Sequence, residues 1–99
     1  MAVQMAQIRW LTRALRNLED EAHYLAQDDP QAAARMVKLI ERSVANLATH
    51  PSLGRSGRVP GTRELVVVGT PYVVPYRVRG QYIDILRVFH GRRRWPSQR

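Results

Sequence analysis

The chain has 99 residues, no Cys and a formal net charge of +8 at pH 7. This length is enough for one hydrophobic core but not for two. Without Cys there can be no disulfide or thiolate metal site, and the three His residues, at positions 23, 50 and 90, have no spacing typical of metal ligands. No segment has the roughly 20 apolar residues of a membrane span or the pattern of a secretion signal. We therefore expect a soluble cytoplasmic protein without a metal or a cofactor.

The net charge lies entirely in the second half of the chain. Residues 1–50 carry six basic and six acidic side chains, whereas residues 51–99 carry ten Arg and only two acids, Glu64 and Asp84. Nearly all the basic residues are Arg, whose planar guanidinium binds phosphate or carboxylate with two parallel hydrogen bonds. A basic surface on a small protein is typical of contact with nucleic acid or with an acidic partner. We expect the first half to form the scaffold and the second half to contact the target.

Two amphipathic helices are predicted in the first half, after a short strand over Val3–Trp10. In the first helix, apolar residues recur every three or four positions over Leu11–Leu25, and Thr12 is the expected N-cap. The second helix has an apolar stripe over Ala33–Leu47, and Asp29–Pro30 is a typical cap and first turn. The short connection predicts an antiparallel helical hairpin.

The second half changes to the pattern of a β-meander. A basic loop rich in Gly and Pro precedes three strand-like runs, Thr62–Val68, Tyr72–Arg79 and Tyr82–Phe89, which are separated by short turns. Pro75 lies inside the middle run and cannot donate a ladder hydrogen bond, so we expect a bulge or a sheet edge there.

Together these elements predict a single α+β domain over residues 1–99. Its parts are a strand with a helical hairpin (1–50), a basic loop (51–61), an antiparallel β-meander (62–90) and a basic tail (91–99). One face of the sheet is expected to pack on the hairpin and to leave the other face available.

The alternation of side chains along a strand, together with sequence spacing, also makes predictions for single residues. In the third strand it places Ile83, Ile85, Arg87 and Phe89 on one face. Arg63 with Glu64, and Arg87 with Asp84, are expected to form surface ion pairs. The charges of Arg13 and Arg16 are expected to be balanced locally by the acids at positions 19–21.

The order of these elements and the segments Gly54–Leu65, Thr70–Val78 and Ile85–Arg92 resemble the RelE/ParE superfamily of bacterial toxins. The resemblance implies a toxin of a type II toxin–antitoxin (plasmid stabilisation) module, encoded beside an acidic antitoxin protein that neutralises it by direct binding. It also implies one of two targets. RelE-like members cleave mRNA in the ribosomal A site, whereas ParE-like members poison DNA gyrase.

A nuclease needs a positioned acid or base and cations that stabilise the developing phosphorane charge. The candidates for these roles are His90, Arg87, Arg92 and Arg63. The resemblance also implies a basic residue directly after the tyrosine that opens the middle strand in the nuclease branch. Here Tyr72 is followed by Val73, and Trp95 near the C-terminus has an indole that cannot transfer a catalytic proton. The catalytic set is therefore incomplete.

A gyrase poison needs no catalytic set, only a surface that traps the enzyme on cleaved DNA. We therefore predict a gyrase inhibitor that is not an enzyme, with a metal-independent, ribosome-dependent endoribonuclease as the alternative. The expected partners are the acidic antitoxin and DNA gyrase, or the ribosome and mRNA, with no membrane and no small-molecule substrate. The residues predicted to contact the target are basic or aromatic: Arg55, Arg58, Arg63, Arg77, Arg79, Arg87, His90, Arg92, Arg93, Arg94 and Trp95.

Overall fold

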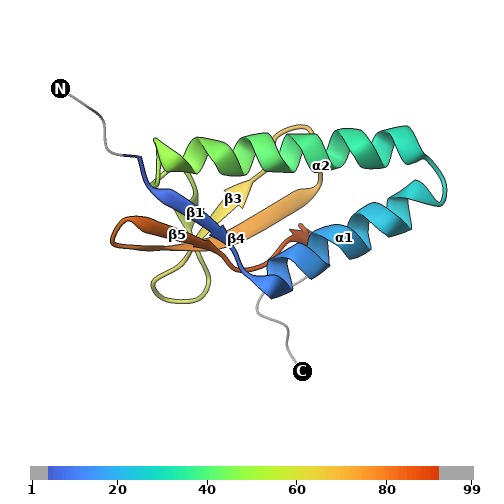
Figure 1. Cartoon of the computed structure of the whole chain (residues 1–99). Helices are drawn as coiled ribbons and strands as arrows, with labels where there is room; N and C mark the ends of the chain where they lie inside the picture. The colour runs from blue at the N-terminus through green and yellow to red at the C-terminus, as the bar shows by residue number, and fades with distance from the viewer. Residues whose placement is uncertain (1–4, 92–99) are drawn as a thin grey trace.

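The computed structural model describes residues 5–91, in which two helices pack on a six-stranded sheet (Figure 1). The elements are, in chain order, β1 (Gln7–Trp10), α1 (Thr12–Ala26), α2 (Pro30–Ala45), a 3-10 turn η1 (Asn46–Ala48), β2 (Arg55–Ser56), β3 (Arg63–Val66), β4 (Tyr72–Arg79), β5 (Tyr82–Ile85) and β6 (Phe89–His90). The strand order is β1-β5-β4-β3-β2, and β6 pairs with β4.

The sheet is mixed and mostly antiparallel. Its strands pair antiparallel except β1, which pairs parallel to β5, with Gln7 opposite Tyr82. A parallel pair requires a crossover, and the helical hairpin supplies it between β1 and the rest of the sheet. The predicted N-terminal strand and α+β class are thus confirmed, while the first strand residues expected from the sequence lie outside the described range.

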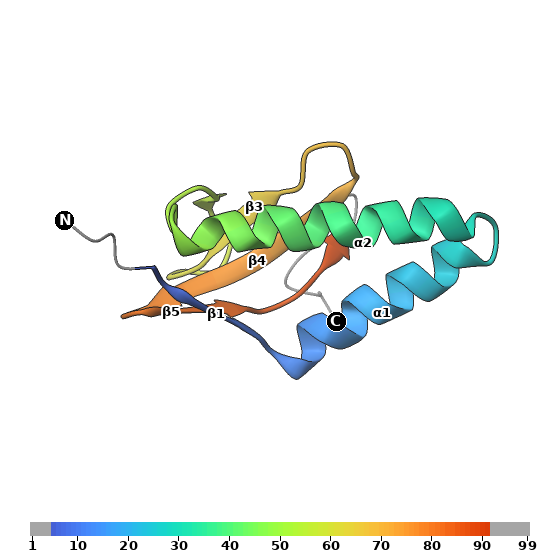
Figure 2. The same cartoon turned by 45° about the horizontal axis from the view of Figure 1, so that its top comes forward.

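The hairpin packs on one face of the sheet and forms the main core with it. Figure 2 shows α2 lying across the sheet with α1 beside it. The core joins α2 residues such as Met36 and Ile40 to Tyr76, Ile83 and Ile85 of the sheet. Burying such side chains contributes about 1.5 to 3 kcal/mol each.

The helix starts differ from each other. Asp29 caps α2 as expected, because its Oδ1 accepts a hydrogen bond from the Ala32 N–H at 3.0 Å. The expected cap at Thr12 is wrong. Leu11 occupies the N-cap position of α1 in an extended conformation and has no side-chain cap hydrogen bond. Leu15 of the predicted stripe is exposed, and α1 instead buries Ala14, whose small side chain allows close approach.

The third predicted strand is interrupted opposite Pro75. β5 ends at Ile85, the Leu86 N–H donates to the Pro75 carbonyl at 2.9 Å, and pairing with β4 resumes in β6 with the register shifted by one residue. The expected bulge near Pro75 is therefore confirmed, with the extra residue on the partner strand.

This shift reverses the side-chain alternation beyond Ile85. Val88 joins the main core with Ile83 and Ile85, whereas Phe89 packs with Val73 in a second cluster. The expectation that Phe89 shares a face with Ile83 and Ile85 is wrong, because a one-residue slip changes the face of the side chains that pair beyond it. Arg87 lies in the link between β5 and β6 and contacts Asn17 of α1, on the side of the main core. No helix within residues 5–91 is long and apolar enough to cross a bilayer.

Candidate functional site

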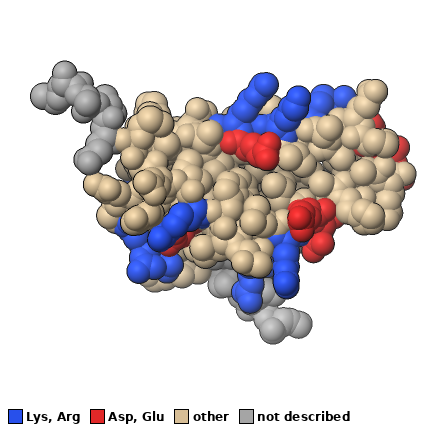
Figure 3. All heavy atoms as spheres, viewed as in Figure 1, with Lys and Arg blue, Asp and Glu red and all other residues tan. Residues whose placement is uncertain are grey.

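The sheet face away from α1 and α2 carries most of the basic side chains that the structure describes on strands. We call it the outer face, and define it by Arg9, Glu64, Val73, Arg77, Arg79, Tyr82 and Asp84, which occupy alternate positions to the core residues of the same strands. Figure 3 shows basic side chains gathered over the end of the sheet where β1 and β5 lie.

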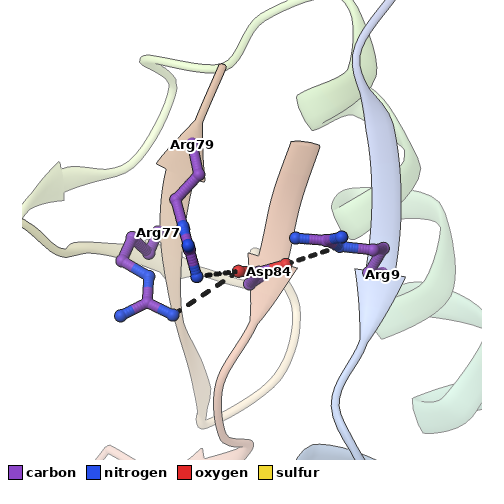
Figure 4. A network of polar contacts seen from close by, with 4 residues as sticks. All are labelled: Arg9, Arg77, Arg79 and Asp84. Atoms are coloured by element: carbon purple, nitrogen blue, oxygen red, sulfur yellow. Dashed lines mark hydrogen bonds and ion pairs between the residues drawn. The ribbon is translucent and has the colours of Figure 1, made fainter. Parts of the chain in front are cut away.

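Asp84 organises this end of the outer face. Its side chain is only 3 % exposed, and its Oδ1 accepts a hydrogen bond from Arg9 Nε at 2.8 Å. Its Oδ2 lies 3.5 Å from Arg77 and 3.8 Å from Arg79 (Figure 4). The hydrogen bond from Arg9 is the main reason why the pKa of Asp84 falls below its usual value, against the opposing effect of burial. Three guanidinium groups thus share one carboxylate and keep a net positive charge.

The structure brings the predicted Arg77 and Arg79 together and adds Arg9, which sequence reasoning missed. Arg9 reaches Asp84 because β1 pairs parallel to β5 in a register that places the two residues side by side. The Arg9 guanidinium also lies 4.0 Å above the ring of Tyr82, a cation–π contact. The expected pair of Asp84 with Arg87 is wrong, because Asp84 is on the outer face and Arg87 contacts α1.

Glu64 organises the basic loop at the other end of the outer face. It is 3 % exposed, its Oε1 lies 3.1 Å from Arg55 Nη2, and its Oε2 accepts from the Arg58 N–H at 3.1 Å. The expected pair of Glu64 with Arg63 is wrong, because adjacent strand residues face opposite sides of the sheet. Arg63 Nη1 donates instead to the Gly54 carbonyl at 2.8 Å.

An apolar cluster lies on the outer face near the start of β4. Val73 is 6 % exposed and packs with Phe89, Val59 and Leu86. Val59 comes from the basic loop, so the loop folds over the outer face at this point. Position 73, which directly follows Tyr72 of β4, is therefore buried in apolar surroundings.

His90 and Arg87 lie in other surroundings. His90 lines a hollow of about 500 Å³ between α1, α2 and the β3–β4 turn, and its ring meets that of Tyr72 edge-on at 5.8 Å. Tyr72 in turn donates to Glu21 Oε1 at 2.9 Å. Arg87 Nε donates to Asn17 Oδ1 of α1 at 2.9 Å.

The described members of the predicted nuclease set, His90, Arg87 and Arg63, thus each have different neighbours. Arg92, Arg93, Arg94 and Trp95 lie outside the described residues. Within residues 5–91, no three His, Asp or Glu side chains lie close enough to hold a metal ion.

Comparison with known proteins gives the same family from sequence and from structure. The family model described as "ParE toxin of type II toxin-antitoxin system, parDE" matches residues 8–95. The putative toxin Y4kP of Sinorhizobium fredii is 47 % identical over 90 residues, which are 91 % of this chain and 93 % of the relative. Toxin RelE2 of Caulobacter vibrioides is 39 % identical over 89 residues, which are 90 % of this chain and 99 % of the relative.

Two solved structures have the same fold. A chain of the chromosomal ParDE system of P. aeruginosa has a TM-score of 0.78 and 31 % identity, covering 88 % of this chain and 97 % of that one. A chain of the toxin–antitoxin complex RelBE2 of Mycobacterium tuberculosis has a TM-score of 0.59 and 27 % identity, covering 87 % and 98 %. With its basic outer face and its helical hairpin on a mixed sheet, this chain belongs to the ParE toxin family of type II toxin–antitoxin systems.

Proposed function

We propose that this toxin poisons DNA gyrase and is neutralised by a cognate antitoxin protein. In this proposal it binds gyrase together with cleaved DNA and catalyses no reaction of its own. The outer face supplies the contact, through Arg77 and Arg79 with Arg9 at one end and Arg55 and Arg58 at the other.

The observation that carries the proposal is the environment of Val73. A phosphoryl-transfer site needs cations or proton donors aimed at the reacting phosphate, and removing one such group costs about 100- to 1000-fold in rate. Within residues 5–91, Val73 is buried in an apolar cluster with Phe89, Val59 and Leu86, and none of these side chains offers either group. A surface that only traps a protein–DNA complex has no such requirement.

The structural neighbours support the same choice. The ParDE chain superposes with a higher TM-score than the RelBE2 chain, 0.78 against 0.59, at similar coverage. The match to a ParE family model over residues 8–95 points the same way.

An antitoxin partner fits two features of the molecule. The basic outer face attracts an acidic chain, and the hollow between α1 and α2 has an apolar lining that includes Leu25, Met36 and Leu39. An acidic segment that folds on binding, with one helical apolar face, would match both. Both solved neighbours come from toxin–antitoxin systems.

A second candidate function is ribosome-dependent cleavage of mRNA. The names of the Caulobacter relatives, RelE1 and RelE2, favour it. In that case His90 is the residue best suited to transfer a proton, and its removal should cost about 100-fold or more in cleavage rate.

Substitution of His90 separates the two functions. We expect His90→Ala and His90→Gln to halt growth nearly as well as the wild type, because gyrase trapping needs no proton transfer. Growth arrest and A-site mRNA cleavage are measured at equal folded yield, with His50→Ala, at an exposed position after η1, as the matched control. Loss of toxicity together with loss of A-site cuts in both His90 variants would contradict the proposal.

A further inference from the structure

A second basic surface lies at the start of α1, apart from the outer face. It is a hollow of about 490 Å³, here called the α1 hollow, and it is lined by Thr12, Arg13, Arg16, Asn17, Asp20 and Arg87. Figure 3 shows basic side chains at this end of α1. Every lining residue is polar or charged, and three of the six are Arg.

The three arginines of the α1 hollow have no acidic partner at ion-pair distance in the described part of the chain. Within residues 5–91, neither Arg13, Arg16 nor Arg87 forms an ion pair; the ion pairs there belong to Arg9, Arg55, Arg77 and Arg79. The acids at positions 19–21, which the sequence placed near Arg13 and Arg16, form no ion pair with them among the described residues. Asp20, the one acid of the lining, leaves the hollow with a net positive charge.

Arg87 is held in place by a hydrogen bond that leaves its outer nitrogens available. Asn17 Oδ1 accepts from Arg87 Nε at 2.9 Å and from the Val88 N–H at 3.2 Å. Within residues 5–91, the terminal nitrogens of Arg87 donate no hydrogen bond. One amide thus fixes both the guanidinium and the link between β5 and β6 that carries it, which is the arrangement expected of a preorganised anion ligand.

The positive charges of Arg87 and Arg13 in the α1 hollow destabilise the folded protein. Burial, and to a smaller extent the positive charge of Arg13, lower the pKa of Arg87. Like charges held close together without a counterion destabilise the folded state. Such local conflicts are expected where the partner that resolves them is a ligand.

We propose that the α1 hollow binds a phosphate of a nucleic-acid backbone. Phosphate oxygens accept hydrogen bonds from several guanidinium groups at once, and they need no apolar contact. A helical protein segment would need apolar side chains to pack against, and the hollow between α1 and α2 provides them in Leu25, Met36 and Leu39, whereas the α1 hollow is lined by polar and charged residues. The proposal adds a direct contact with nucleic acid to the toxin surface, and it does not depend on gyrase being the target.

Binding of labelled duplex DNA and duplex RNA to the full-length chain tests the proposal. Fluorescence anisotropy is measured for the wild type, for Arg13→Gln/Arg16→Gln, and for the control Lys38→Gln/Arg42→Gln, which removes the same charge from exposed positions of α2. We expect the hollow variant to bind about fivefold more weakly, and its slope of log affinity against log salt to shrink by about 0.9 for each phosphate that is no longer neutralised. The control should change both quantities by less than half as much.

The two probes distinguish the source of the phosphate. Weaker binding of both DNA and RNA identifies a backbone site that either duplex can fill, and weaker binding of DNA alone identifies a site shaped for B-form spacing. Equal weakening in the hollow and control variants, or no weakening in either, would overturn the proposal. If gyrase is still inhibited in that case, the proposed function stands without this site.

The Tm of Arg13→Gln distinguishes a ligand-binding role of Arg13 from a role in stabilising the fold. Arg13→Gln removes a charge that opposes Arg87, so the Tm should rise by about 2 °C while nucleic-acid affinity falls. A lowered Tm with unchanged affinity would show that Arg13 serves the fold, and would also overturn the proposal.

Discussion

Asp84 is a buried acid that orients cations rather than cancelling them. It is 2 % exposed and is contacted by Arg9, Arg77 and Arg79, each of which is about half exposed. Burial of the carboxylate makes it dependent on these partners, while the partners keep much of their surface for a ligand. The outer face therefore presents an ordered group of guanidinium groups instead of independent flexible side chains.

Replacing this carboxylate should destabilise the protein. We expect Asp84→Asn to lower the free energy of unfolding by about 2 kcal/mol, because three cations lose their shared counterion and repel one another. Urea denaturation measures the change, and Asp28→Asn, at an exposed position, is the matched control. Equal stability of Asp84→Asn and the wild type would show that the network does not support the fold.

The same network predicts a pH dependence with a definite sign. The folded-state pKa of Asp84 lies below its ordinary value of 3.8, so its ionised form is favoured by folding. Its contribution is fully present above the unfolded pKa and disappears as the pH falls through the folded pKa. The stability difference between wild type and Asp84→Asn should thus be constant above about pH 5 and shrink in more acidic solution.

Tyr76 connects the sheet to the loop after η1. Its hydroxyl donates to the Pro51 carbonyl at 2.7 Å and accepts from the Gly54 N–H at 2.8 Å. A Cβ on residue 54 would lie 2.8 Å from the same hydroxyl, so this close approach requires Gly. Burial raises the pKa of Tyr76.

Removing this hydroxyl leaves a buried N–H without its acceptor. We expect Tyr76→Phe to cost about 1 to 2 kcal/mol in unfolding free energy. Chemical denaturation measures the loss, with Tyr24→Phe, at a site that is 73 % exposed, as the control. The account of the loop is wrong if both substitutions have the same small effect.

For single residues, the sequence predicted the chemical role of a side chain better than it predicted which residue that side chain contacts. It identified Arg77 and Arg79 as surface cations, and the structure places both on the outer face. It could not identify Arg9 as the partner of Asp84, because 75 positions separate them and only the β1–β5 register joins them. Both acids of the second half were paired with a nearby Arg in the prediction, whereas strand alternation and the bulge direct them elsewhere.

Glu64 anchors the part of the basic loop between η1 and β3 that runs from Arg55 to Arg58. Glu64 holds it through Arg55 and through the Arg58 N–H. Its exposed guanidinium groups can contact a target only if this anchor keeps the loop on the outer face. The paired residues of β2 and β3 add a short ladder, with Arg55 opposite Glu64.

Weakening the anchor should open the loop locally without unfolding the sheet. We expect Glu64→Gln to raise the rate of trypsin cleavage after Arg58 by about tenfold, because the substitution removes a charge-assisted hydrogen bond worth about 1.4 kcal/mol. Mass spectrometry of the fragments measures this rate, and Glu41→Gln on α2 is the matched control. Unchanged cleavage would mean that Glu64 does not anchor the loop.

The boundaries and irregularities of helices and strands were predictable from the sequence where a local side chain or a missing N–H determines them. The start of α2 at Asp29–Pro30 and the irregularity at Pro75 follow from a side-chain cap and a missing N–H. The start of α1 was not predictable in the same way, because Leu11 enters the helix from a paired strand, with its N–H bonded to the Ile85 carbonyl at 3.1 Å. Tertiary pairing there replaces the cap that Thr12 would have formed.

For the whole molecule, the charge asymmetry of the sequence does not divide the surface into two halves. Arg9 joins Arg77 and Arg79 on the outer face, and Arg13 and Arg16 join Arg87 at the α1 hollow. Residues from the electrically neutral first half thus complete both basic surfaces. Composition predicted that a basic surface exists, whereas its location depends on contacts between residues far apart in the chain.

The measurement that tests the central claim most directly is trapping of gyrase on cleaved DNA. Purified full-length toxin is incubated with DNA gyrase and plasmid DNA, and the linear DNA released by denaturant and protease is quantified. We predict that cleaved DNA increases with toxin concentration, in the absence of ribosomes, and that His90→Ala behaves like the wild type. Unchanged gyrase activity at toxin concentrations that cut ribosome-bound mRNA in the A site would contradict the account.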